Sequence, residues 1–211
     1  MKRLLLVAPL VLTISCDKAD EKTAVKSEEA ASSKATKEAE PPEVKKEAEP
    51  PPKPAKPAAT EFVAKDHKFS VMSERAPRIS NPKTAAGAKT TNYTFNAPGA
   101  PGAIMVLVAT IPLKKGASKA KRKKALAEAG DSIVKKYSAV FSSDEELMVG
   151  EHLGREVAFN ANHPRMGKMA GRSKIVIKGS ELYQAMWIGD PKAADLIAEG
   201  NALLDSFKFT E

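Results

Sequence analysis

Residues 17–60 form a segment of 44 residues that cannot supply a hydrophobic core. The segment consists almost wholly of Lys, Glu, Ala, Pro, Ser, Thr and Asp, and Val25 and Val44 are its only larger apolar side chains. Because so little apolar surface can be buried, the entropy of ordering is not offset, and we expect a disordered tether. Folding is then left to residues 61–211, which suffice for one domain of ordinary size.

The amino terminus has the pattern of a cleavable secretion signal over residues 1–15. Lys2 and Arg3 supply positive charge, and an apolar stretch of 11 residues, 4–14, follows. A permanent membrane span needs about 20 apolar residues, so this stretch is too short to be one. Thr13-Ile14-Ser15-Cys16 ends the stretch and resembles the lipobox of bacterial lipoproteins, although Thr13 replaces the preferred leucine.

Cys16 is the only cysteine, so no disulfide can form within the chain. The resemblance to lipoproteins implies that Cys16 carries the lipid and anchors the chain to a bilayer, on the extracytoplasmic side of the cell envelope. An unmodified cysteine in an ordinary signal peptide is the alternative. Asp17 favours the inner membrane by the sorting rule of enterobacteria, and both membranes stay open. Export also argues against a nucleic-acid partner, although 61–211 holds 23 Lys and Arg against 16 Asp and Glu.

Apolar periodicity predicts an α+β domain in 61–211. Alternating patterns predict strands, and 103–111, apolar on both faces, predicts a central strand covered on both sides. A period of three to four residues predicts a helix over 119–141 capped by Ser118, and Pro191 begins a second helix. We therefore expect an antiparallel sheet with two main helices packed on it. The predicted strands are 67–73, 91–96, 103–111, 145–149, 155–160, 173–178 and 182–188, with a closing strand at Phe207 and Phe209.

Three short sequence segments in the second half of the domain resemble those of a known family. The segments are LGREV at 153–157, KIVIKGSELY at 174–183 and LDSFK at 204–208. Together with the order of elements, they resemble the PsbP-like superfamily, which includes PsbP, DcrB and LpqN. The resemblance implies a PsbP-like sandwich and a binding or accessory role. It transfers no catalytic residue, and we expect Gly154 and Arg155 to serve a turn and a surface charge pair.

No pattern of catalytic residues is visible in the sequence. The histidines His67, His152 and His163 stand outside metal-ligand and nucleophile motifs, so we predict no catalytic residue and no cofactor. One weak alternative is a Cu(I) site formed by His163, Met166 and Met169, because soft thioether ligands suit that ion. The other interpretation is that these methionines pack at the end of the sheet.

Seven cations occupy 11 residues just before and within the start of the first predicted helix. Positive charge at the amino terminus of a helix opposes the helix dipole, and so the arrangement is locally unfavourable. One interpretation is a solvated loop. The other is a surface that docks on an anionic lipid, lipopolysaccharide or an acidic partner. The cations are Lys114, Lys115, Lys119, Lys121, Arg122, Lys123 and Lys124.

These observations favour a membrane-anchored envelope lipoprotein whose non-catalytic domain binds a protein or an anionic envelope component. A module for a small ligand or Cu(I) is the alternative, and an enzyme is the third hypothesis. An enzyme would need a polar cleft that gathers residues from distant parts of the sequence.

Overall fold

The computed structural model describes residues 58–82, 88–95, 102–114, 116–164 and 166–211. The predicted signal peptide, Cys16 and nearly all of the predicted tether lie outside the described residues. Within the described part of the chain, no helix has the length and apolar character needed to cross a membrane.

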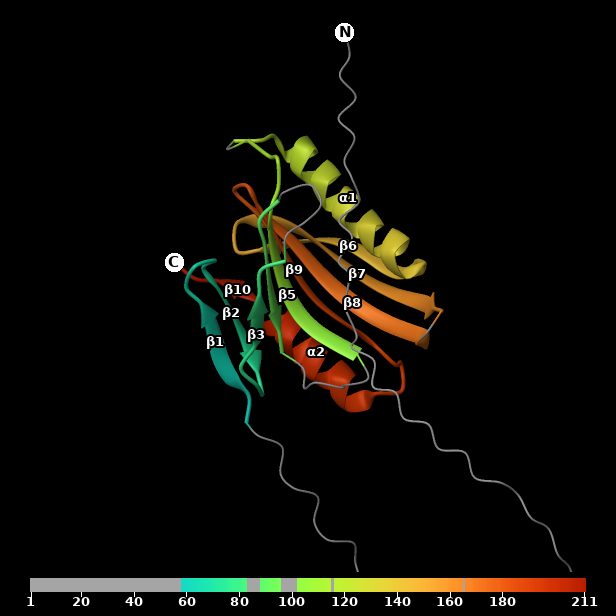
Figure 1. Cartoon of the computed structure of the whole chain (residues 1–211). Helices are drawn as coiled ribbons and strands as arrows, with labels where there is room; N and C mark the ends of the chain where they lie inside the picture. Colours follow the sequence, from blue (N-terminus) through green and yellow to red (C-terminus); the bar gives the residue numbers. More distant parts are fainter. Residues whose placement is uncertain (1–57, 83–87, 96–101, 115, 165) are drawn as a thin grey trace, which may run out of the picture. The chain divides into compact units, whose positions relative to one another are not determined.

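A seven-stranded antiparallel sheet is the centre of the fold (Figure 1). Its strand order is β3-β4-β5-β9-β8-β7-β6, so β5 and β9 lie inside it and β3 and β6 form its edges. Each neighbouring pair is antiparallel, as the sequence predicted. The strands are β3 (Arg78–Ser80), β4 (Thr90–Thr94), β5 (Gly102–Thr110), β6 (Ala139–Val149), β7 (His152–His163), β8 (Gly167–Lys178) and β9 (Glu181–Gly189).

A second, three-stranded sheet joins the two ends of the domain. Its order is β1-β2-β10, with β1 at Thr60–Ala64, β2 at Phe69–Ser73 and β10 at Lys208–Phe209. Both outer strands pair antiparallel with β2. The predicted closing strand is confirmed as β10 at Phe209, whereas Phe207 caps the end of α2. The sequence patterns did not predict β1 or β3.

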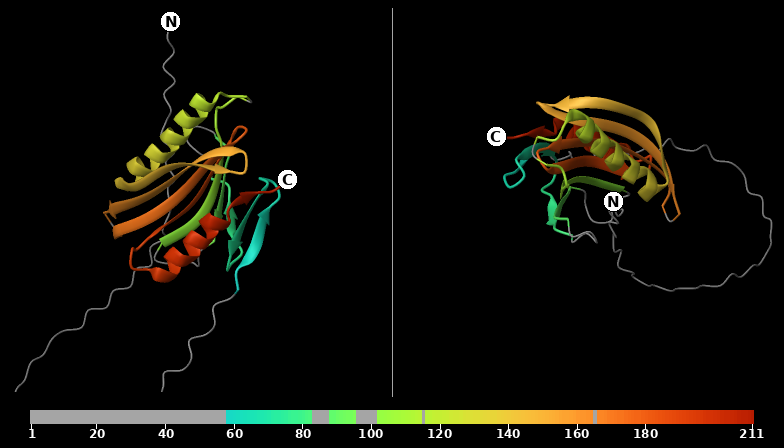
Figure 2. Two further views of the ribbon diagram at one scale, coloured as in Figure 1. Left: turned by 180° about the vertical axis from the view of Figure 1, so that it is seen from behind. Right: turned by 90° about the horizontal axis from the view of Figure 1, so that it is seen from above.

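Helices α1 (Lys119–Tyr137) and α2 (Ala194–Ser206) lie on opposite faces of the large sheet (Figure 2). On β9, Tyr183 and Trp187 join the core cluster of α2 and the small sheet, while the intervening Met186 joins the cluster under α1. This alternation makes the sheet a middle layer with a core on each side. The predicted α+β class is confirmed, and so is the burial of β5 on both faces.

The first helix ends earlier than its periodicity predicted. Ser138 adopts a left-handed conformation with φ of 50°, and its N–H bonds to the carbonyl of Val134. The chain then enters β6, where Val140 is 72% exposed. Val140 therefore continued the apolar period by coincidence, and the predicted helix over 119–141 is wrong in its last turn.

Two further predictions are corrected at turns. The second helix begins at Ala194 rather than Pro191, because the Asp190 side chain accepts a hydrogen bond from the N–H of Lys192, 2.8 Å away, and holds a turn there. Gly154 lies inside β7 instead of in a turn. The turn before β7 uses Gly150, whose φ of 58° suits glycine.

Candidate functional site

The basic stretch is carried by the amino-terminal half of α1 and the loop before it. Ser118 caps the helix as predicted, and its hydroxyl accepts a hydrogen bond from the N–H of Lys121 at 3.4 Å. The first turn contains no acidic residue. Because the helix dipole places partial positive charge at this end, it disfavours the cations there.

Two of these cations are used within the fold. Lys123 forms an ion pair with Glu146 of β6 at 2.6 Å, and this hydrogen bond lowers the pKa of the Glu146 carboxyl. Arg122 donates from Nε to the carbonyl of Ala117 at 3.2 Å. These two residues thus help to fix α1 and its preceding loop.

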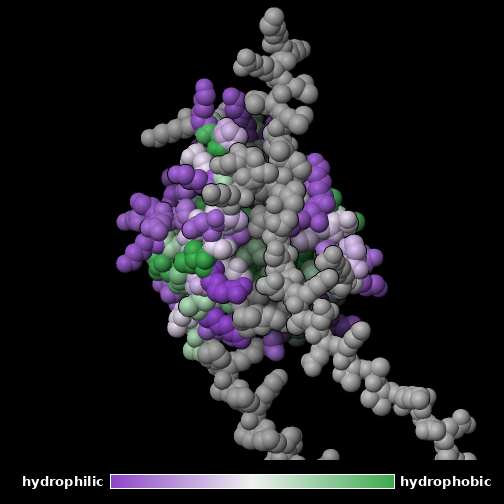
Figure 3. Space-filling view, viewed as in Figure 1, coloured by the Kyte–Doolittle hydropathy of each residue, from purple (hydrophilic) through white to green (hydrophobic). Residues whose placement is uncertain are grey.

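The other described cations of the stretch are exposed. Lys114, Lys119, Lys121 and Lys124 form no ion pair with any residue that the structure describes. Lys115 lies outside the described residues. In the view of Figure 1, α1 lies at the upper right, and hydrophilic side chains project there in the space-filling view (Figure 3). We call Lys119, Lys121 and Lys124 the α1 lysines.

The opposite side of α1 is held by Arg155 of β7. Its guanidinium makes two hydrogen bonds with the carboxylate of Asp144, at 2.6 and 2.5 Å. Its Nη1 also donates to the carbonyls of Leu126 and Ala127. A Cβ on Gly130 would lie 2.5 Å from that Nη1, so glycine makes room for the arginine. The predicted surface charge pair of Arg155 is confirmed, and it anchors the helix.

A surface hollow of about 180 Å³ lies between α1 and the β6–β7 hairpin. Its charged lining consists of Lys123, Asp144, Glu146 and Arg155, which form the two ion pairs described above. These charges pair with one another across the hollow, and the two ion pairs tie α1 to the β6–β7 hairpin.

The histidine and methionine set is spread over the β7–β8 hairpin. His163 is the last residue of β7, Met166 is 54% exposed at the turn, and Met169 is buried in the core under α1. Met169 therefore packs in the core, in agreement with the second interpretation of the methionines. Copper binding by His163, Met166 and Met169 stays a prediction.

A polar cluster around His67 was not predicted from the sequence. Its Nδ1 lies 3.3 Å from Glu181 and its Nε2 lies 3.3 Å from the hydroxyl of Thr91. The hydroxyl of Tyr183 donates to Glu181 at 2.7 Å, and burial raises the pKa of this tyrosine well above its usual value. The cluster ties the β1–β2 turn to β4 and β9, so we interpret it as structural.

His152 is the first residue of β7 and contacts β10 of the small sheet. Its ring packs edge-on against Phe209 at 4.9 Å between centroids, and burial together with Lys178 lowers its pKa. Among the described residues, no group of three or more His, Cys, Asp and Glu side chains is placed to hold a metal ion.

Comparison with solved structures finds similarity to the solution structure of cyanobacterial PsbP (CyanoP) from Synechocystis sp. PCC 6803. The TM-score is 0.49 at 9% identity, over 72% of this chain and 92% of that chain. PA94 from Pseudomonas aeruginosa, a protein of unknown function and putative regulator, matches with a TM-score of 0.40 at 10% identity, over 69% and 90%. No family model and no curated protein matches the sequence. These similarities concern the fold and assign no residue a role.

Proposed function

We propose that this chain is an envelope lipoprotein, anchored through lipid on Cys16, whose domain is a non-catalytic binding or accessory module. In this proposal the α1 lysines hold the domain against an anionic component of the envelope. The lipoprotein assignment is supported by the lipobox pattern and the single cysteine.

The observation that carries the docking role is the difference between neighbouring cations on α1. Lys123 forms an ion pair with Glu146, whereas Lys121 and Lys124 are exposed and have no ion-pair partner among the described residues. Lys119 is exposed too and interacts with Glu146 only through longer-range electrostatic attraction. Over its whole length α1 holds seven Lys and Arg against two acidic residues. Such an excess of positive charge attracts phosphate-rich surfaces, and the attraction weakens as salt rises.

The test uses the mature chain with Cys16→Ser, so that binding does not depend on acylation. Sedimentation with vesicles of phosphatidylglycerol and phosphatidylcholine measures the affinity at low and high salt. Each lysine near an anionic surface contributes about 1 kcal/mol, so the triple variant K119Q/K121Q/K124Q should bind about a hundredfold more weakly at low salt.

The matched control removes the same charge elsewhere. Lys65, Lys89 and Lys192 are exposed and lie outside α1, and K65Q/K89Q/K192Q should bind nearly as tightly as the parent chain. Equal losses in the two triple variants would show that net charge alone drives binding. Parent-like binding by the α1 variant would reject the surface altogether.

A further inference from the structure

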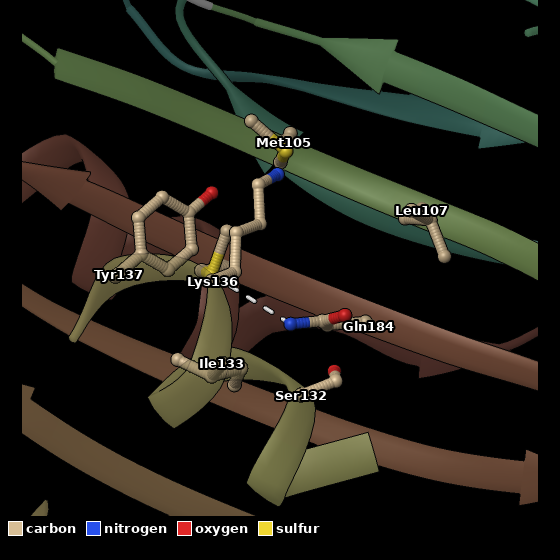
Figure 4. Close-up of a pocket in the computed structure, with 8 residues that line it drawn as sticks. Met105, Leu107, Ser132, Ile133, Lys136, Tyr137 and Gln184 are labelled. Atoms are coloured by element: carbon tan, nitrogen blue, oxygen red, sulfur yellow. Dashed lines mark hydrogen bonds between the residues drawn. The ribbon is translucent and has the colours of Figure 1, made fainter. Parts of the chain in front are cut away.

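A cleft lies beside α1 on the face of the sheet opposite α2. The helix packs on β6, β7 and β8, and its flank faces the neighbouring strands β5 and β9. Between helix and strands is a cavity of about 50 Å³ (Figure 4). Its apolar lining is Met105 and Leu107 from β5, Met186 from β9, and Ile133 and Tyr137 from α1.

The lining is suited to a flexible apolar ligand. Met105 and Met186 have unbranched side chains that rearrange at low energetic cost, and methionine-lined sites adapt to what they bind. A cavity of about 150 Å³ accommodates benzene, so this cavity of about 50 Å³ can hold only part of a ligand unless the two methionine side chains move. The remainder of the ligand then lies at the open mouth of the cleft.

The side chain of Lys136 places a positive charge at the mouth of the cleft. Lys136 lines the cavity from α1 and extends across it toward Met105 (Figure 4). Its ammonium group lies 4.9 Å from the centroid of the Tyr137 ring, and no carboxylate pairs with it among the described residues. An anionic group entering the cleft would therefore meet a positive charge that the fold itself has not neutralised.

Polar atoms without partners lie on the same face of the sheet. Asn92 of β4 is directly opposite Leu107, and Thr90 is opposite Ala109, so both share the face that bears the cleft. Asn92 is 9% and Thr90 4% exposed. Asn92 Oδ1 and Thr90 Oγ1 have no hydrogen-bond partner among the described residues. Buried polar atoms are nearly always hydrogen-bonded, so each of these atoms needs a partner such as a water, although neither residue lines the cavity itself.

We propose that this cleft binds an anionic amphiphile of the alkyl carboxylate class. The carboxylate pairs with Lys136, and the alkyl part lies against Met105, Leu107 and Met186. The site is separate from the α1 lysines, and the inference does not rest on the docking function proposed above.

Calorimetric titration of the mature Cys16→Ser chain with monomeric decanoate tests the proposal, and decyltrimethylammonium serves as the cationic comparator. Decanoate should bind saturably with one molecule per chain, and the cationic probe should bind at least tenfold more weakly. K136Q removes one charge-assisted contact and should weaken decanoate binding about tenfold. The matched control K135Q removes a neighbouring exposed lysine that does not line the cavity, and it should bind as the parent does.

Ser132 provides a second, independent variant. It is exposed and lines the cavity, so S132F narrows the mouth without filling the core, and it should abolish saturable binding. Urea unfolding of each variant confirms that it is folded. The proposal is overturned if the parent chain shows no saturable binding of decanoate, if K136Q and K135Q behave alike, or if S132F binds as the parent does.

Discussion

Replacing Gly200 with alanine tests how tightly α2 packs on the sheet. An exposed Gly in a helix usually gains about 1 kcal/mol of stability on substitution by Ala. Gly200 is buried, and a Cβ there would lie 2.5 Å from Trp187 Cβ and 2.6 Å from Trp187 Cδ1. Real Cβ atoms do not approach neighbours this closely, so either α2 or Trp187 must shift.

The magnitude follows from the contacts that the shift disturbs. Overpacking a core costs about 1–3 kcal/mol. Trp187 also donates a hydrogen bond from Nε1 to Asn201 Oδ1 at 2.9 Å, whose loss costs about 1 kcal/mol. After the gain in helix propensity is subtracted, Gly200→Ala should lower the free energy of unfolding by about 2 kcal/mol.

Urea unfolding of the mature Cys16→Ser chain, followed by Trp187 fluorescence and circular dichroism, measures this change. With a slope of about 2 kcal/mol per molar urea, the midpoint should fall by about 1 M. Ala198→Gly is the control, because Ala198 is exposed on the same helix and the reverse substitution should cost only about 1 kcal/mol. A midpoint that rises in Gly200→Ala would refute the packing argument.

Two further predictions concern charge and anchoring. Cys16→Ala should move the protein from the membrane to the soluble envelope fraction and remove the acyl mass from its amino-terminal peptide; unchanged fractionation and peptide mass would reject lipidation at Cys16. The hydrogen bond from Arg155 lowers the pKa of Asp144, so this pair stabilises the fold above the unfolded-state pKa of about 3.9 and loses its effect as pH falls through the lower folded-state pKa. The stability difference between the parent and Asp144→Asn, from urea midpoints, should therefore shrink below about pH 4, and a difference independent of pH would contradict the assignment.

Elements with a strong apolar period were predictable from the sequence. The core of α1, its Ser118 cap and the doubly covered strand β5 follow from residues close together in the chain. The missed strand β3 has three residues, all exposed, and so offers no apolar alternation to detect. The end of α1 was missed because Ser138 adopts its left-handed cap without the glycine that usually signals one.

The glycines show why tertiary contacts reverse local expectations. Gly130 is a weak point by helix propensity, yet it leaves space for the guanidinium of Arg155 on β7. In the sequence, Gly154 looks like a glycine that marks a turn. In the fold it is required inside a strand, because a Cβ there would come within 2.9 Å of the carbonyl oxygen of Ile175 on the next strand. Each requirement comes from a residue more than 20 positions away, beyond the reach of any local pattern.

For the candidate sites, the basic residues of α1 could be identified from the sequence, but the acidic residues that pair with them could not. Lys123 and Lys124 are equivalent in the sequence, and only the position of β6 shows that Lys123 is paired with Glu146. The cleft could not be predicted at all, because Lys136, Leu107 and Met186 come from three separate elements.

The small sheet also determines how the domain responds to mechanical load. The chain enters the described fold through β1, an edge strand of five residues whose only strand partner there is β2. Thr60 pairs with Ser73 at the open end of this hairpin. Tension applied to Thr60 across the strand direction would load the β1–β2 hydrogen bonds one after another from this end, because those bonds lie perpendicular to the strands. An anchored domain would then yield at β1 first, while the seven-stranded sheet stays intact.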